Sequence, residues 1–182
     1  MKLLSRLFGR ASAREAEPVE ALGPTALATI YERAGQYLIE ASDRTRWAEA
    51  GFWVSSGEIR VLDAAVPDEV LGDAILVALA KSRIEVPVPP REANQEAALF
   101  RAMRVRSRLA AMQGTRACVL TREPPDGALR VEPQQNGGTA GSERGYRPMA
   151  QAAVVLPPAS SATELGRSAR AALAQPLQHQ QE

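Results

Sequence analysis

The stretch Pro67–Arg83, PDEVLGDAILVALAKSR, organises the rest of the chain because a related stretch returns near the other end. The second stretch is Ser161–Ala174, SATELGRSARAALA. When Gly72 is aligned with Gly166, the apolar positions of the two stretches coincide. The sequence therefore predicts an internal repeat, of which these segments are the clearest part.

The same register continues upstream of both segments without a gap. In this alignment Gly51 falls on Gly145. Gly51 lies 21 residues before Gly72, and Gly145 lies 21 residues before Gly166. The pair Val61-Leu62 likewise falls on Val155-Leu156. Two unrelated segments rarely share such a spacing, so we expect the repeat to include the strand before each helix.

Both segments have the pattern of amphipathic helices. The apolar stripe of the first helix consists of Leu71, Ile75 and Leu79. Pro67 fits the first helical position, where its missing N–H costs nothing, and Ser161 with Glu164 has the spacing of a capping box. The glycine inside each helix costs about 1 kcal/mol relative to Ala. We therefore expect each helix backbone to lie close against a sheet.

Three strands are expected before each helix, from β-branched and aromatic residues bounded by turn residues. In the first half they cover residues 26–32, 36–41 and 58–64, and in the second half residues 117–121, 128–132 and 152–156. A polar loop holding two tryptophans precedes the third strand of the first half, and the Gly-rich loop 136–145 replaces it in the second half.

The two halves are joined by the Pro-rich segment 86–90 and a basic linker helix, so the sequence predicts an α+β single domain built from two βββα pseudo-repeats. The expected boundaries are a flexible lead-in at 1–24, a domain at 25–174 with repeats 25–83 and 116–174 and linker helix 92–113, and a loose tail at 175–182. One continuous sheet is favoured over two, because it leaves less strand edge exposed.

The bulk composition fits one globular domain. The chain has 182 residues, of which 45% are hydrophobic and 24% charged, with a net charge of +1. The charge is uneven: residues 21–100 carry seven bases and twelve acids, whereas residues 101–116 carry five arginines and no acid. The acidic part suits a basic partner, and the arginine block suits an acidic one.

Residues for catalysis or metal binding are scarce. His179, the single histidine, lies in the Gln-rich tail, which removes the usual base and the usual metal ligand. Cys118 is expected to be a buried small residue in a strand. The Gly-rich loop lacks the Lys-Ser/Thr ending of a phosphate-binding loop. We therefore expect no enzyme activity, no metal and no cofactor.

The arginine block has two readings. It comprises Arg101, Arg104, Arg106, Arg108 and Arg116. The first reading is a solvated helix face with arginine stems packed on the core. The second is contact with nucleic-acid phosphates, but Phe100 is the single nearby aromatic for base stacking, so no direct nucleic-acid partner is expected.

The start of the chain, MKLLSRLFGR, has too few apolar residues for a signal peptide, and no stable membrane insertion is expected.

Four pieces of the chain carry a family resemblance. They read YERAGQYLIEAS, GFWVSSGEIRVLDAAVPDEVLGDAILVALAKSR, GALRVEP and GYRPMAQAAVVLPPASSATELGRSARAALA. Together, over roughly residues 25–174, they resemble the CdiI family of contact-dependent growth inhibition immunity proteins. The resemblance implies a cytoplasmic protein that binds and blocks the C-terminal toxin domain of a CdiA-type protein, with the toxin often a nuclease such as one that cleaves tRNA.

The family offers no motif for the contact residues, so the expected toxin-binding patch comes from this sequence. It consists of Trp47, Trp53, Glu58, Asp63, Asp68, Glu69 and Asp73. Charged rims speed association and buried aromatic residues anchor it. The alternative is that the acids cap a helix and the tryptophans complete the core. Two other functions stay open: a chaperone or interaction module for a secreted effector, and a nucleic-acid-binding regulator that uses Arg101–Arg116.

Overall fold

The computed structural model describes residues 23–46, 52–90, 96–140 and 144–175. The lead-in at 1–22, Trp47 and the end of the tail lie outside these residues. The elements are β1 (Ala26–Arg33), β2 (Gln36–Arg44), β3 (Trp53–Asp63), α1 (Asp68–Lys81), α2 (Ala97–Ala102), α3 (Arg108–Met112), β4 (Arg116–Glu123), β5 (Ala128–Asn136), β6 (Tyr146–Pro148), the 3-10 helix η1 (Ala150–Ala152), β7 (Val154–Leu156) and α4 (Ala162–Leu173).

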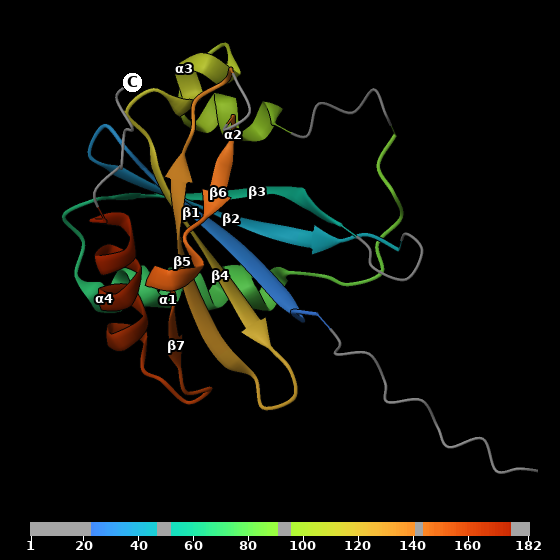
Figure 1. Ribbon diagram of the computed structural model, residues 1–182, viewed down its shortest axis with the longest axis vertical. Coiled ribbons are helices and arrows are strands. Elements are labelled where there is room, and N and C mark those ends of the chain that lie inside the picture. Colours follow the sequence, from blue (N-terminus) through green and yellow to red (C-terminus); the bar gives the residue numbers. More distant parts are fainter. Residues whose placement is uncertain (1–22, 47–51, 91–95, 141–143, 176–182) are drawn as a thin grey trace, which may run out of the picture.

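All strands of the described residues belong to one antiparallel sheet. The predicted α+β class and the single continuous sheet are therefore confirmed. The strand order is β3-β2-β1-β4-β5-β6, and β7 pairs with β5 beside β6 (Figure 1). The two halves meet at the central pair β1–β4, where Thr29 faces Val119. This pairing leaves β3 at one side of the sheet and β6 and β7 at the other.

Helices cover the two faces of the sheet unequally. Leu38 and Ile39 are neighbours in β2 and therefore point to opposite faces. Ile39 belongs to the main core formed with α1 and α4, whereas Leu38 packs with Met103 beneath α2 and α3. Burying a side chain of this size contributes about 1.5–3 kcal/mol. The main core therefore lies between the sheet and the two long helices (Figure 1).

The two helical glycines contact each other's helices, which corrects the expectation that they lie against a sheet. A Cβ atom on Gly72 would lie 1.8 Å from the carbonyl oxygen of Ala162 in α4. A Cβ atom on Gly166 would lie 1.9 Å from the carbonyl oxygen of Asp68 in α1. The helix backbones thus touch at a reciprocal crossing that excludes any side chain.

The helix starts follow the expected chemistry, with one shift. In α4 the Ser161 hydroxyl accepts the Glu164 N–H at 3.2 Å, and the Glu164 carboxylate accepts the Ser161 N–H at 2.8 Å, which confirms the capping box. These bonds lower the pKa of Glu164. In α1, Pro67 is the N-cap instead of the first helical residue, and the helix begins at Asp68.

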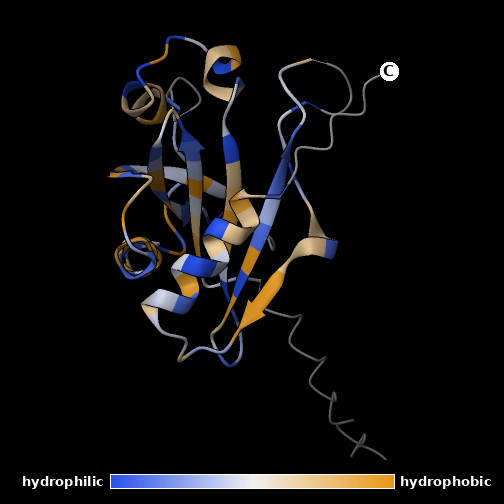
Figure 2. Cartoon of the chain, turned by 90° about the vertical axis from the view of Figure 1, so that its left-hand side faces the viewer, coloured by the Kyte–Doolittle hydropathy of each residue, from blue (hydrophilic) through white to orange (hydrophobic). Residues whose placement is uncertain are grey.

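The third strand differs between the halves. β3 runs for 11 residues and already includes Trp53, which corrects the expected loop around that residue. In the second half, the predicted strand 152–156 is reduced to β7, and β6 forms within the preceding segment. Pro148 ends β6 because proline cannot donate to the strand ladder. The short β7 stands out as hydrophobic in Figure 2.

The predicted helix at 92–113 is wrong, because the chain forms two short helices there. After α2, Arg104 adopts a left-handed conformation with φ of 56°. The N–H of Val105 then bonds to the Phe100 carbonyl at 2.9 Å, and the N–H of Arg104 to the Arg101 carbonyl at 3.1 Å. This pattern is a Schellman motif, which ends a helix. Ser107 caps α3 by accepting the Ala110 N–H.

Candidate functional site

The clearest hollow suited to a partner lies between β3 and α1. It has a volume of about 290 Å³ and is lined by Ile39, Ala41, Glu58, Ile59, Arg60, Ala74, Val77, Ala78 and Lys81. The floor consists of buried aliphatic side chains from β2 and α1, such as Ile39 and Ala74. Since α1 packs against β1 and β2, β3 reaches past the helix and leaves this groove open. We call it the β3–α1 groove.

The rim of the groove is mixed in character. The Lys81 ammonium and the Glu58 carboxylate form an exposed ion pair across it. Val77, 45% exposed, stands on the α1 side, with Val70 two turns before it at 37%. Arg60 is exposed on the β3 side. An apolar floor with a charged rim is the usual anatomy of a protein–protein interface.

The outer edge of β3 adds a second feature to this flank. In the described residues β3 pairs with β2 alone, so its other edge has no strand partner. Val61, on β3, is 42% exposed. An unpaired strand edge offers a row of backbone donors and acceptors to another chain. The flank therefore combines shape, apolar surface and backbone polarity.

The structure separates the predicted patch residues. Trp53 and Glu58 lie on β3, where Trp53 is half-buried opposite Arg44 and Glu58 borders the groove. Glu69 and Asp73 are exposed on α1. Glu58, Glu69 and Asp73 therefore present carboxylates on the flank formed by β3 and α1.

The other two acids are engaged within the fold. The Asp63 carboxylate accepts the Ala65 N–H at 2.7 Å and so shapes the turn into α1. Asp68 accepts the Arg170 guanidinium at 2.6 Å and lies 3.9 Å from that of Arg167. Asp68 thus holds the start of α1 to α4.

Arg170 is a key residue that the sequence did not single out. Its guanidinium donates to the Tyr37 hydroxyl at 2.9 Å, to the Ala64 carbonyl at 2.8 Å and to the Val66 carbonyl. It also stands over the Tyr37 ring, 5.2 Å from the centroid. Burial raises the pKa of Tyr37, which the arginine partly opposes. No signal in the sequence separates Arg170 from Arg167, which is charged and lies in the same helix.

A second buried polar group lies on the opposite face of the sheet. Glu40 is 6% exposed, and its carboxylate accepts hydrogen bonds from the hydroxyls of Ser55 and Tyr31, the latter at 3.4 Å. Burial raises the pKa of Glu40, and the two hydroxyl donors partly oppose this. The carboxylate is enclosed by the fold and does not face the groove.

The described residues show no grouped metal ligands and no exposed thiol. Within them, no three side chains of His, Cys, Asp or Glu are arranged as metal ligands. Cys118 is fully buried, as the sequence predicts, and burial raises its thiol pKa. No helix in this part of the chain is long and apolar enough to cross a bilayer.

A family model identifies the family of the chain, and two solved structures share its fold. A family model described as CdiI, CDI immunity protein, matches residues 28–175. A protein of unknown function, NMB0488 from Neisseria meningitidis, has a TM-score of 0.63 at 16% identity, covering 81% of this chain and 93% of that one. A CdiA-CT/CdiI toxin and immunity complex from Yersinia pseudotuberculosis has a TM-score of 0.59 at 17% identity, covering 81% and 95%. No curated protein matches the chain.

Proposed function

Because the chain belongs to the CdiI family of CDI immunity proteins, we propose that it binds and inhibits a cognate toxin domain at the C-terminus of a CdiA-type protein. Members of this family are inhibitors and not enzymes. The similar Yersinia structure is a complex of a toxin with its immunity protein, which supports a folded toxin domain as the partner.

The observation that carries this proposal is the β3–α1 groove beside an unpaired strand edge. A folded domain that inserts an apolar side chain over Ile39 and Ala74 would bury that floor, while the Glu58–Lys81 pair at the rim fixes its orientation. Apolar anchors in pockets supply most of the binding free energy, and rim charges mainly set the rate and specificity.

The toxin-binding patch of the sequence analysis is proposed in a revised form. Trp53, Glu58, Glu69 and Asp73 are its direct contact residues, because they are accessible on the β3–α1 flank. Trp47 keeps its predicted role on the adjoining segment. Asp63, which is exposed and accepts the Ala65 N–H, and Asp68, which pairs with Arg170, are proposed to support the patch indirectly by placing α1.

The toxin is proposed to be a nuclease, such as one that cleaves tRNA, acting in the cytoplasm. Nucleases bind phosphates through basic surfaces. The exposed carboxylates of Glu58, Glu69 and Asp73 along the flank suit such a surface. The immunity protein would then meet its target in the compartment where that RNA is cut.

The domain is also proposed to derive from two βββα pseudo-repeats, residues 25–83 and 116–174. The reciprocal contact of Gly72 and Gly166 supports an approximate twofold relation. The central β1–β4 pair also supports this relation, since each half contributes one strand to it. The segment between the repeats contains α2 and α3.

Coexpression tests the proposed function directly. This chain is expressed with the polypeptide encoded immediately upstream, captured by affinity, and the partner is assayed for RNase and DNase activity before and after denaturing separation. We expect a copurifying partner that gains activity once separated. A partner whose activity does not depend on this chain would contradict inhibition and favour a chaperone. A partner released into full activity that lacks nuclease activity would remove only the nuclease assignment.

A further inference from the structure

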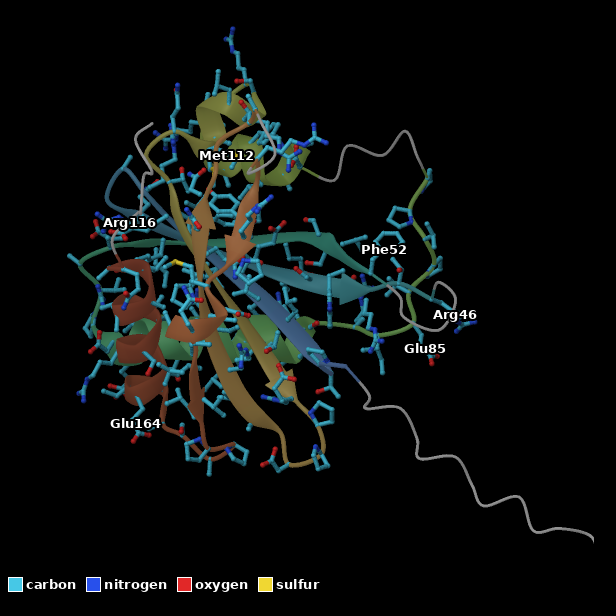
Figure 3. The ribbon with its side chains drawn as sticks, in the orientation of Figure 1. Arg46, Phe52, Glu85, Met112, Arg116 and Glu164 are labelled. Atoms are coloured by element: carbon cyan, nitrogen blue, oxygen red, sulfur yellow. The ribbon has the colours of Figure 1, made fainter. Side chains whose placement is uncertain are left out.

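The end of the molecule that carries α2 and α3 is strongly basic. From residue 97 to residue 116 the chain has five arginines and no acid. Arg101, Arg104 and Arg106 are exposed, and within the described residues none of the three has an ion pair. Nitrogen-tipped side chains surround Met112 at this end in Figure 3. We call Arg101, Arg104, Arg106 and Arg108 the arginine end.

The apolar side chains of this segment face the sheet, which leaves the arginines on the outside. Leu99, Phe100 and Val105 pack in a small core with Leu38 of β2 and Ile59 of β3. Arg108 lies 3.5 Å from the Glu96 carboxylate, with both side chains substantially exposed. The arginine end is thus a solvent-facing surface held on a packed base.

Arg104 occupies a position where glycine is favoured. It is the left-handed residue of the Schellman motif after α2, with φ of 56°. A residue with a Cβ atom is strained in this conformation. Strained residues cluster at functional sites, where the side chain serves a purpose other than stability. The chain therefore presents a guanidinium here against the preference of its backbone.

The arginine end adjoins the proposed toxin-binding flank. α2 packs on β3 through Ile59, and Ile59 also lines the β3–α1 groove from the other side. A domain seated over the outer edge of β3 therefore meets α1 below the strand and α2 above it. The α1 side carries Glu69 and Asp73, while the α2 side carries four arginines and, among the described residues, one acid, Glu96, which pairs with Arg108.

We propose that the arginine end is the second part of the toxin-binding surface and contacts an acidic patch on the toxin. This inference rests on the proposed function. A footprint that is acidic on one side of β3 and basic on the other fixes the orientation of the partner and rejects toxins with the reverse charge pattern. Leu109, 52% exposed beside Arg108, gives this surface an apolar contact suited to a protein partner.

The test measures the affinity and association rate for the upstream-encoded toxin domain, in an inactive form, from low to high salt. The double variant Arg101→Gln/Arg106→Gln is compared with the control Arg122→Gln/Arg167→Gln, which removes the same charge elsewhere. We expect about tenfold weaker binding at low salt for the first, mainly through slower association, and less than a twofold change for the control. Equal losses in both variants would overturn the inference.

Arg104→Gly separates a binding role from a structural one. Glycine relieves the left-handed strain, so we expect the thermal midpoint to rise by about 2–4 °C while toxin binding weakens by about threefold. A rise in stability with unchanged binding would overturn the role of Arg104. The Arg101→Gln/Arg106→Gln variant is also tested for binding to a 20-base-pair RNA duplex. If it loses an RNA affinity that the parent protein has, while its toxin affinity is unchanged, the arginine end binds nucleic acid and the inference is overturned. If the parent protein binds no toxin at all, the proposed function itself fails.

Discussion

The two long helices make one shared crossing but expose different surfaces. Beside β3, α1 exposes Val70 and Val77, whereas α4 exposes Glu164 and Arg167 at its start. The outer strands differ in the same sense, because β3 is continuous while β6 and β7 are short and separated by η1. One flank of the sheet thus has a continuous strand beside a groove, whereas the other has an interrupted strand edge on which Val154 and Val155 of β7 are exposed.

The crossing itself is also asymmetric in its polar contacts. At the shift of 94 residues that aligns Gly72 with Gly166, Arg170 of α4 corresponds to Leu76 of α1. The Arg170–Asp68 ion pair therefore ties one end of the crossing and has no equivalent at the other. The two helices therefore differ in the polar contacts that they make at their crossing.

The largest expected effect is on the crossing. We expect Gly72→Ala and Gly166→Ala each to lower the free energy of unfolding by about 3 kcal/mol, because the added methyl meets a backbone oxygen that cannot move alone. This loss exceeds the gain of about 1 kcal/mol from the better helix propensity of Ala. Urea denaturation measures both variants. If only one of the two variants is destabilised, the two glycine contacts of the crossing are not equivalent.

The ion pair at one end of the crossing is the next test. Arg170→Met leaves Asp68 and the carbonyls of Ala64 and Val66 without their donor. We expect a loss of about 2–3 kcal/mol in the free energy of unfolding. The neighbouring Arg167→Gln, whose side chain is 72% exposed, is expected to change stability by less than about 0.5 kcal/mol. Similar losses in the two variants would show that Arg170 has no special role.

The functional difference between the helices is tested at aligned exposed positions. Val77→Asp places a charge over the groove floor, and we expect toxin affinity to fall by about 30-fold with little change in stability. The control is Ala171→Asp, at the aligned and exposed position of α4, for which binding is expected to stay the same. Titration calorimetry with the toxin domain measures both. Equal weakening would argue that the partner covers both helices.

The smallest effect concerns two carboxylates on the face of the sheet away from α1 and α4, one on β2 and one on β5. Glu40 faces Thr29 in the β1–β2 pair as Glu132 faces Val119 in the β4–β5 pair, but Glu132 has an arginine partner, Arg130, at 3.3 Å. Burial raises the folded-state pKa of Glu40. The ionisation of Glu40 therefore lowers the free energy of unfolding as the pH rises above the pKa that Glu40 has in the unfolded chain.

This pH dependence of the free energy of unfolding predicts how two variants behave. Glu40→Gln removes the ionisation, so relative to the parent it is expected to gain stability between about pH 4.5 and pH 8. Glu132→Gln loses an ion pair instead and is expected to show no such gain. Thermal unfolding across this pH range measures both variants. A parallel pH profile for the parent and Glu40→Gln would contradict the burial cost assigned to Glu40.

Several features were predictable because they depend on local spacing. The stripe of Leu71, Ile75 and Leu79 and the capping box of Ser161 and Glu164 follow the period and end chemistry of a helix, and both are observed. The hairpins were predictable from apolar and β-branched runs bounded by turn residues. The linker helix was mispredicted because Arg104 and Val105 turn the backbone into a Schellman motif, which no sequence preference of arginine indicates.

The candidate site was predictable only in part. Glu58, Glu69 and Asp73, which were predicted to contact a toxin, are exposed on one flank, since charged residues beside an amphipathic stripe face solvent, and their role in binding stays a prediction. Asp68 was taken as a contact residue although Arg170, 102 residues away, holds it inside the fold. The groove has no sequence signature, because it arises where α1 stops short of β3.

By itself, the sequence determined most of the strands, the two long helices and the scarcity of histidine and cysteine, because periodicity and composition act over neighbouring positions. The tertiary structure alone decided that Gly72 meets Ala162, that Arg170 closes on Asp68, and that β3 has an unpaired edge above an apolar groove. These features depend on which surfaces meet through space, and packing settles that only once both halves of the chain are folded together.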